Sequence, residues 1–106
     1  MPSPEQPVPP APASIPVVHN PACRRFESQI AAAPLAFLSY RHEGESVWLE
    51  HTFVPDELRG RGVAAALVRA ALIESRQQRW RVIPSCSYVA AYIDRNPEFA
   101  DLLKRS

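Results

Sequence analysis

Four segments in the first half of the chain carry apolar residues in patterns typical of β-strands. They cover residues 15–19, 25–30, 35–41 and 47–54. Proline, asparagine or glycine follows each of them, as expected where a strand ends in a turn. The connections between the segments are short, which predicts an antiparallel meander.

The spacing of apolar residues changes in the second half of the chain. From Val63 to Leu72 they recur at i, i+1, i+4, i+5, i+8 and i+9, which predicts the buried face of an amphipathic helix. Residues 81–83 form a short apolar strand, Ser85 is a candidate helix cap, and residues 86–94 fit a second, shorter helix. This order predicts an α+β (layered α/β) fold, with helices packed on a mostly antiparallel sheet.

Composition separates the N-terminus from the rest of the chain. Seven of the twelve prolines of this 106-residue sequence fall within the first sixteen residues, among alanines and without a hydrophobic period. We therefore expect a disordered, Pro/Ala-rich tail over residues 1–14. Residues 15–106 are then a single domain, because a chain of this length forms one core of limited depth.

Charge and cysteine content exclude several classes of function. A formal net charge of +1 gives no field that would attract nucleic acid or an anionic membrane, so neither is an expected partner. No apolar run approaches the ~20 residues that span a bilayer. Cys23 and Cys86 neither make a disulfide framework nor have the spacing of metal ligands. We therefore expect a cytoplasmic protein without a bound metal.

Two of the three glycines, Gly60 and Gly62, lie between the end of a predicted strand and the first turn of a predicted helix. Such a junction suits phosphate groups, because the first N–H groups of a helix lack intrahelical partners and glycine lets an anion approach the backbone. Arg59 and Arg61 flank the turn and can pair with phosphate oxygens. The residues that complete a P-loop or a dinucleotide-binding fingerprint are missing. On the evidence of the turn alone, two other interpretations stay open. The turn could be part of an Arg-Gly segment that binds nucleic acid, or it could bind nothing.

Three motifs in order give a more specific signal than the turn. They are Glu50-His51-Thr52-Phe53-Val54-Pro55, then Arg59-Gly60-Arg61-Gly62-Val63-Ala64, then Ile83-Pro84-Ser85-Cys86-Ser87-Tyr88-Val89 followed by Arg95-Asn96-Pro97. In these residues the chain resembles the GNAT acetyltransferase superfamily. More narrowly, it is similar to the small, stand-alone, YjdJ-like subgroup. The resemblance covers roughly residues 26 to 99.

The resemblance implies that acetyl-CoA is the cofactor. In the family, backbone amides of the loop and of the first helical turn hold the CoA pyrophosphate. The matching positions here are Arg59, Gly60, Arg61, Gly62, Val63, Ala64 and Ala65. The strand before the loop runs along the pantetheine arm, which involves the backbone near Phe53 and Val54. Residues 81–83 splay away from that strand and leave room for the thioester.

Cys86 and Tyr88 are candidates for the chemistry of acetyl transfer. A thiol at the start of a helix has a lowered pKa, so Cys86 could accept the acetyl group transiently or supply a proton to departing CoA. The alternative interpretation of Cys86 is a small buried residue that only packs. By the resemblance, Tyr88 is a candidate proton donor to the thiolate.

His51 and Glu50 are candidate general bases. Alternation along the predicted strand places His51 on one face with Val47, Leu49 and Phe53, where a packed core histidine is the alternative interpretation. Glu50 would act from the opposite face, where an exposed carboxylate without a role is the alternative.

The resemblance thus implies an N-acetyltransferase that uses acetyl-CoA. The chain is too short for the pair of helices that usually shape the acceptor pocket in the family, so the acceptor is left open as an amine-bearing small molecule or protein. A CoA-binding or protein-interaction module without turnover is the alternative function.

Overall fold

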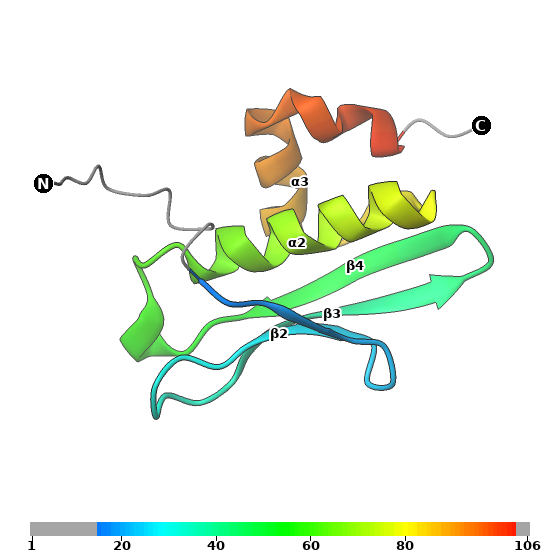
Figure 1. The fold of residues 1–106 in the computed structure, drawn as a ribbon. Helices are drawn as coiled ribbons and strands as arrows, with labels where there is room; N and C mark the ends of the chain where they lie inside the picture. The colour runs from blue at the N-terminus through cyan, green and yellow to red at the C-terminus, as the bar shows by residue number, and fades with distance from the viewer. Residues whose placement is uncertain (1–14, 104–106) are drawn as a thin grey trace, which may run out of the picture.

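The computed structural model describes residues 15–103, so the predicted tail over residues 1–14 lies outside the described residues. The elements in chain order are β1 (Val18–Asn20), β2 (Arg25–Ser28), β3 (Ala36–Glu43), β4 (Ser46–Phe53), the 3-10 helix η2 (Asp56–Leu58), α2 (Val63–Gln78), β5 (Arg81–Pro84), α3 (Ser87–Arg95) and the 3-10 helix η3 (Pro97–Leu103). Figure 1 shows α2 running along the sheet, with α3 and η3 on the other side of α2 from β1 and β2.

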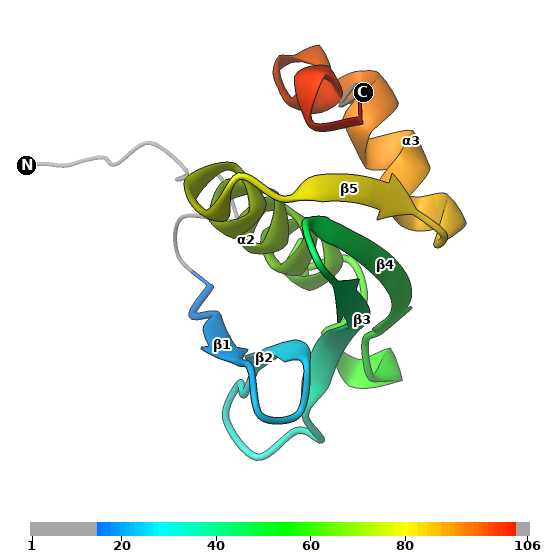
Figure 2. The same cartoon turned by 90° about the vertical axis from the view of Figure 1, so that its right-hand side faces the viewer.

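The strands form one sheet in the order β1-β2-β3-β4-β5. The first four pair as the predicted antiparallel meander, whereas β5 pairs with β4 in parallel. A parallel pair needs a crossover connection, and α2 supplies it. Figure 2 shows β5 beside β4 at one edge of the sheet and β1 at the other. The predicted α+β class, with helices on a mostly antiparallel sheet, is confirmed.

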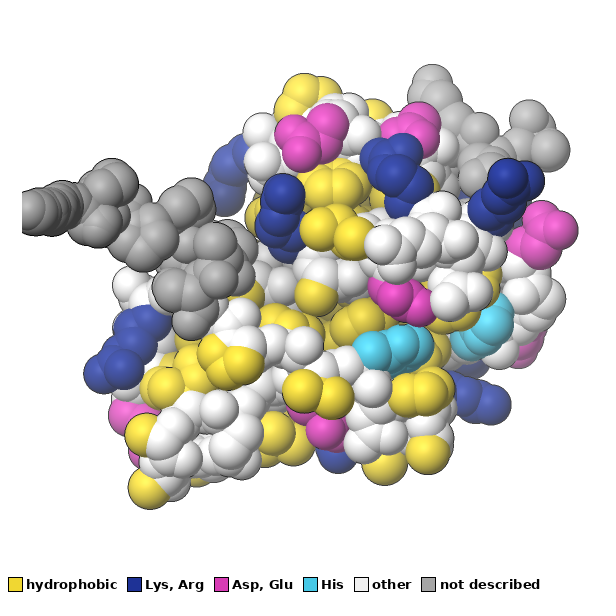
Figure 3. Space-filling view, in the orientation of Figure 1, with side chains coloured by type: hydrophobic (Ala, Val, Ile, Leu, Met, Phe, Trp, Pro, Cys, Tyr) yellow, Lys and Arg dark blue, Asp and Glu magenta, His cyan; other side chains and the backbone are white. Residues whose placement is uncertain are grey.

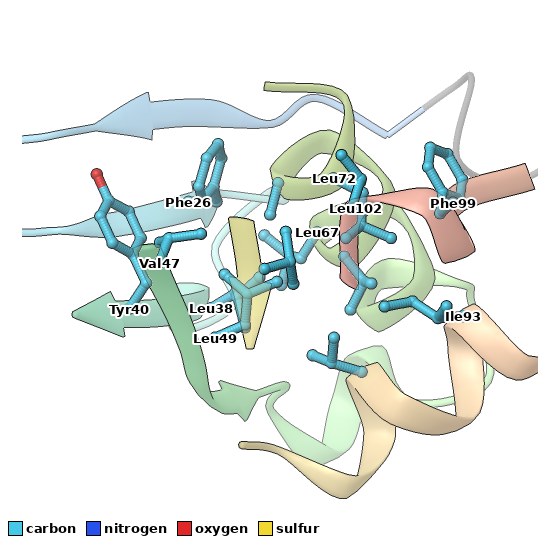
Figure 4. Packing of buried hydrophobic residues seen from close by; sticks show 14 of the residues in the cluster. Phe26, Leu38, Tyr40, Val47, Leu49, Leu67, Leu72, Ile93, Phe99 and Leu102 are labelled. Carbon is cyan, nitrogen blue, oxygen red and sulfur yellow. The ribbon is translucent and has the colours of Figure 1, made fainter. Parts of the chain in front are cut away.

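The core lies between α2 and the sheet. The predicted apolar face of α2 is buried, with Leu67, Val68, Ala71 and Leu72 fully covered and Val63 1% exposed. Figure 4 shows Leu67 facing Leu38 and Leu49 of the sheet, and Leu72 near Leu102 of η3. Burying one such leucine contributes about 1.5–3 kcal/mol, which is why the helical period dominates this part of the chain.

Most predicted strand and helix ends differ from the observed ones by one or two residues, and two of the differences have a clear physical cause. The first strand was expected over residues 15–19 but covers Val18–Asn20. Pro16 has no N–H to donate to a ladder, and its carbonyl accepts a hydrogen bond from the Ser28 hydroxyl at 2.6 Å instead. The second helix begins at Ser87, so Cys86, not Ser85, occupies the N-cap position. The Cys86 N–H donates to the Leu49 carbonyl at 3.0 Å, which keeps this residue extended.

The pairing of β3 with β4 contains an irregularity that positions the site. Ser39 pairs with His51 and Tyr40 with Leu49, so Glu50 is an additional residue in β4. Such a bulge reverses the side-chain alternation beyond it.

The bulge corrects the predicted orientation of His51. Val47 and Leu49 are buried in the core, but His51 and Phe53 beyond the bulge are exposed. The expectation that His51 shares a face with Val47 and Leu49 is therefore wrong. Thr52, and not His51, points toward the core side of the sheet.

Candidate functional site

A cavity of about 580 Å³ lies where β4 and β5 part. The two strands pair only from Ser46↔Arg81 to Leu49↔Pro84. Beyond Leu49, no strand within residues 15–103 pairs with this edge of β4. The cavity is lined by residues from β4, the loop, α2 and α3: Thr52, Val54, Leu58, Arg59, Gly60, Gly62, Val63, Ala64, Ala65, Cys86, Ser87 and Tyr88.

One end of the cavity is the glycine turn that precedes α2. Gly60 and Gly62 both have φ of +81°, a left-handed conformation that favours glycine. Gly62 is the N-cap of α2, and the first helical hydrogen bond runs from the Ala66 N–H to the Gly62 carbonyl at 3.0 Å. The N–H groups of the first turn therefore lack i−4 partners. No acidic residue lies in that turn, so this end of the cavity suits an anion.

Most of the positions assigned to cofactor binding lie together at this cavity. Val54, Arg59, Gly60, Gly62, Val63, Ala64 and Ala65 line it. Two side chains do not. The Phe53 ring packs on Phe37, with centroids 5.5 Å apart, and the Arg61 side chain is not part of the lining.

The other end of the cavity holds the Cys86 thiol at the N-cap of α3. The Thr52 hydroxyl lies 3.7 Å from the Cys86 sulfur. Burial raises the pKa of the Cys86 thiol, but interactions of the thiolate with the backbone N–H of Val89, the Thr52 hydroxyl and the backbone of Tyr88 together lower it by more. As a result, the pKa of Cys86 lies below that of an ordinary cysteine. The geometry does not meet the criterion for a side-chain hydrogen bond that caps α3. The site nevertheless stabilises the reactive thiolate relative to a free cysteine.

Tyr88 lines the cavity next to Cys86. Burial raises the pKa of its phenol, the neighbouring Tyr92 raises it further, and Arg95 partly opposes both. A phenol with a raised pKa keeps its proton at neutral pH. Tyr88 is therefore suited to donate a proton and not to act as a base.

Glu50 and His51, the two predicted bases, do not line this cavity. The Glu50 carboxylate lies 3.5 Å from the Arg41 guanidinium, which in turn lies over the Trp48 ring at 3.9 Å. These groups share the outer face of the sheet, and the exposed His51 lies beyond them.

Thr52 is the site residue that the sequence reasoning missed. Assuming strict alternation, we expected Thr52 to face the same way as Glu50, away from the core. The bulge at Glu50 turns it inward. Neither glycine nor proline marks this bulge, so no local signal in the sequence could have revealed it.

Within residues 15–103, no group of three or more His, Cys, Asp or Glu side chains is placed to hold a metal ion. In the same part of the chain, no helix has both the length and the apolar character needed to cross a bilayer.

Comparison with known proteins agrees with this geometry. Residues 25–102 match the model of the family described as GCN5-related N-acetyl-transferase. Protein NATD1 of Xenopus tropicalis is 35% identical over 86 residues, which cover 79% of each chain, and protein NATD1 of Mus musculus is 34% identical over 83 residues, which cover 76% of each. The solution structure of a GCN5-like protein from Staphylococcus aureus is similar with a TM-score of 0.61 and 27% identity, over 74% of this chain and 79% of that one. The chain therefore belongs to the GCN5-related N-acetyltransferase family.

Proposed function

We propose that this protein is an N-acetyltransferase that binds acetyl-CoA in the cavity between β4, β5 and the start of α2. One observation carries the proposal: a single cavity connects the glycine turn of α2 with the Cys86 thiol. A ligand that fills it needs an anionic group at one end and a group that reacts with a thiol at the other. Acetyl-CoA has both, and it is the cosubstrate typical of the family.

The residues along the cavity fit the parts of acetyl-CoA. The free N–H groups at the start of α2 and the Arg59 guanidinium suit the pyrophosphate. The edge of β4 near Phe53 and Val54 has no strand neighbour on the β5 side within residues 15–103, so its backbone can pair with the amides of the pantetheine arm. The thioester would then reach Thr52 and Cys86.

We propose two steps for the reaction. The Cys86 thiolate attacks the thioester carbonyl, a new sulfur–carbon bond forms, and the bond to the CoA sulfur breaks. The CoA thiolate leaves and takes a proton from Tyr88. A neutral amine then attacks the acetyl-cysteine, the Cys86 thiolate leaves, and the proton lost by the amine restores the Tyr88 phenol, directly or through solvent. In the alternative course the amine attacks acetyl-CoA directly, the Cys86 thiol protonates the departing CoA, and the proton lost by the amine restores the Cys86 thiol, directly or through solvent.

The residue that would accept a proton from the acceptor amine lies outside the cavity. Glu50, on the outer face at the bulge, is the candidate base for an amine that approaches from that face. We assign no role to His51, since its ring is exposed beyond the bulge and away from Thr52. The acceptor is an amine-bearing small molecule or protein, and the free thiols of Cys23 and Cys86 suit a reducing, cytoplasmic setting.

The mass of the intact protein after incubation with acetyl-CoA tests the role of Cys86. We expect one acetyl adduct in the wild type and in Cys23→Ala, the matched control for the second cysteine. We expect none in Cys86→Ala. An adduct that persists in Cys86→Ala, or that never forms, would exclude Cys86 as acetyl acceptor.

A CoA-binding or protein-interaction module without turnover is the second candidate function. It is favoured by the open outer face of the sheet, where Phe53 is 46% exposed. Release of CoA measured with a panel of amines, polyamines and peptides separates the two functions. Steady turnover with any acceptor rules out the binding-only function, and binding of acetyl-CoA without release rules out the transferase.

A further inference from the structure

A second cavity, of about 500 Å³, lies at the far end of β3 and β4 from Cys86. Its volume is within the ~300–1,000 Å³ typical of small-molecule sites. His42 of the lining pairs with Val47, five residues before Thr52. At ~3.3 Å per residue this is about 16 Å along β4. An amine bound here could not reach the thioester site, so this cavity is a separate feature of the molecule.

Aromatic rings form the wall of the second cavity. The Trp80 ring lies 4.5 Å from the His42 ring and 6.2 Å from the Tyr40 ring, measured between centroids. The Tyr40 hydroxyl and His19 Nε2 are 2.7 Å apart, and the His19 ring stacks on Phe26 at 4.3 Å. Because the rings pack on one another, the wall is formed before any ligand binds. Figure 3 shows histidine side chains at the surface of this face, beside an acidic side chain.

The cavity also contains a carboxylate that has no guanidinium or ammonium partner among residues 15–103. The Glu74 side chain is 25% exposed, and within that range its carboxylate contacts only His19 Nδ1 at 3.9 Å and the Gln78 amide at 2.8 Å. Other carboxylates of the described chain, such as Glu27 and Glu43, have an arginine within 3 Å. A partly buried carboxylate that lacks such a partner is costly, and a ligand cation would compensate for it.

A charge of the opposite sign faces the same cavity. Arg24 lines it, and its guanidinium makes no ion pair with any residue in 15–103. Burial raises the pKa of Tyr40, Arg24 lowers it and Glu74 raises it, so both charges lie close enough to act on the Tyr40 hydroxyl. Arg24 and Glu74 do not pair with each other. An isolated cation in this cavity would be repelled by Arg24, and an isolated anion by Glu74.

We propose that this cavity binds a small zwitterion of the α-amino acid class. The ammonium of the ligand pairs with Glu74, the carboxylate pairs with Arg24, and an apolar side chain lies against Trp80 and Tyr40. Bidentate pairing of a guanidinium with a carboxylate and packing on aromatic rings are strong recognition elements. The site is distinct from the acetyl-CoA cavity and does not depend on the proposed transfer.

Fluorescence of Trp80 measures binding directly in Trp48→Phe, because the chain has only two tryptophans. Three probes share the phenyl ring and differ in the charged groups that they carry: L-phenylalanine, 2-phenylethylamine without the carboxylate, and 3-phenylpropionate without the ammonium. We expect a saturable change with L-phenylalanine and at least about tenfold weaker binding of each other probe, since one ion pair contributes about 1.4 kcal/mol or more. No acetyl-CoA is present, so the outcome is independent of the transferase activity.

Charge-neutral variants identify the residues that bind. In the Trp48→Phe background, we expect Glu74→Gln and Arg24→Gln each to weaken L-phenylalanine binding about tenfold. The control variants Glu57→Gln and Arg95→Gln, at distant exposed positions, should leave binding unchanged. No saturable signal with L-phenylalanine, or equal binding of the three probes, would overturn the proposal. Equal binding by Glu74→Gln and the parent would also overturn it. The comparison of probes uses unaltered binding residues, so it decides the question even if a variant fails to fold.

Discussion

The hydroxyl of Thr52 and the sulfur of Cys86 lie 3.7 Å apart, although 34 residues separate them in the chain. Thr52 belongs to the end of β4, and Cys86 precedes α3. The contact forms because β4 and β5 pair in parallel only as far as Leu49 and Pro84, and because the bulge at Glu50 turns Thr52 inward. The reactive group of the proposed site thus depends on an irregularity of the sheet.

Replacement of Thr52 by valine should raise the pKa of the Cys86 thiol. The hydroxyl stabilises the thiolate, so its loss favours the protonated form and slows alkylation at neutral pH. The rate of alkylation by iodoacetamide against pH measures this in Cys23→Ala, where Cys86 is the only thiol. In the parent we expect a midpoint below that of free cysteine measured alongside, and in the variant a higher midpoint. A midpoint that does not move would contradict the role of Thr52.

The strong helical period of the chain made much of the fold predictable. Leu67 and Leu72 lie in the core as their spacing indicated, and the family motifs placed the glycine turn at the start of α2. The face of His51 could not be predicted, because nothing in the sequence marks the bulge at Glu50. The helix cap was misplaced by one residue, because a hydrogen bond from the Cys86 N–H to β4, formed only in the fold, keeps this residue extended.

The left-handed turn at Gly60 should be needed both for stability and for acetyl-CoA binding. Gly60→Ala introduces a Cβ at φ +81°, which costs about 1–2 kcal/mol of unfolding free energy. Apart from Gly60 and its two chain neighbours, no described residue has an atom within 4 Å of that Cβ, so the cost is one of backbone conformation and not of packing. We also expect weaker acetyl-CoA binding, measured by calorimetric titration, because the Cβ occupies the surface of the cavity.

Gly44→Ala is the matched control for this variant. Gly44 lies at the tip of the β3–β4 hairpin with φ of +57°. A Cβ added there would likewise meet no atom of residues 15–103 within 4 Å, apart from its own chain neighbours. The same backbone strain should lower its stability by a similar amount and leave acetyl-CoA binding unchanged. If both variants lose binding equally, the effect of Gly60 is one of stability alone.

His51 should be dispensable for acetyl transfer. The bulge leaves its ring exposed and outside the cavity that holds Cys86. His51→Gln is therefore expected to release CoA at the wild-type rate with any acceptor that supports turnover, whereas Cys86→Ala is expected to lose at least about tenfold. A tenfold or greater loss in His51→Gln would show that the imidazole takes part in the reaction.

Arg76 should anchor η3 to α2. Its guanidinium donates to both carboxylate oxygens of Asp101, at 2.8 and 3.1 Å, and to the Glu98 carbonyl at 2.8 Å. The hydrogen bond to Asp101 raises the pKa of Arg76. We expect Arg76→Ala to lower the melting temperature and Arg76→Lys to recover only part of the loss, because lysine lacks the planar fork.

A double-mutant cycle separates the pair from other effects of the substitution. Combining Arg76→Ala with Asp101→Asn should lower the melting temperature by less than the sum of the two single changes, because each change breaks the same interaction between the two side chains. Full additivity would mean that the two side chains stabilise the fold independently.

Thermal unfolding of the protein with increasing acetyl-CoA is the decisive test of the proposed cosubstrate site. If the cavity between the glycine turn and Cys86 holds acetyl-CoA, the ligand stabilises the folded state, by about 2.7 kcal/mol at a hundred times its Kd. The melting temperature should then rise with ligand concentration in the wild type and in Gly44→Ala, and rise less in Gly60→Ala. A melting temperature that stays constant at saturating acetyl-CoA would contradict the proposal.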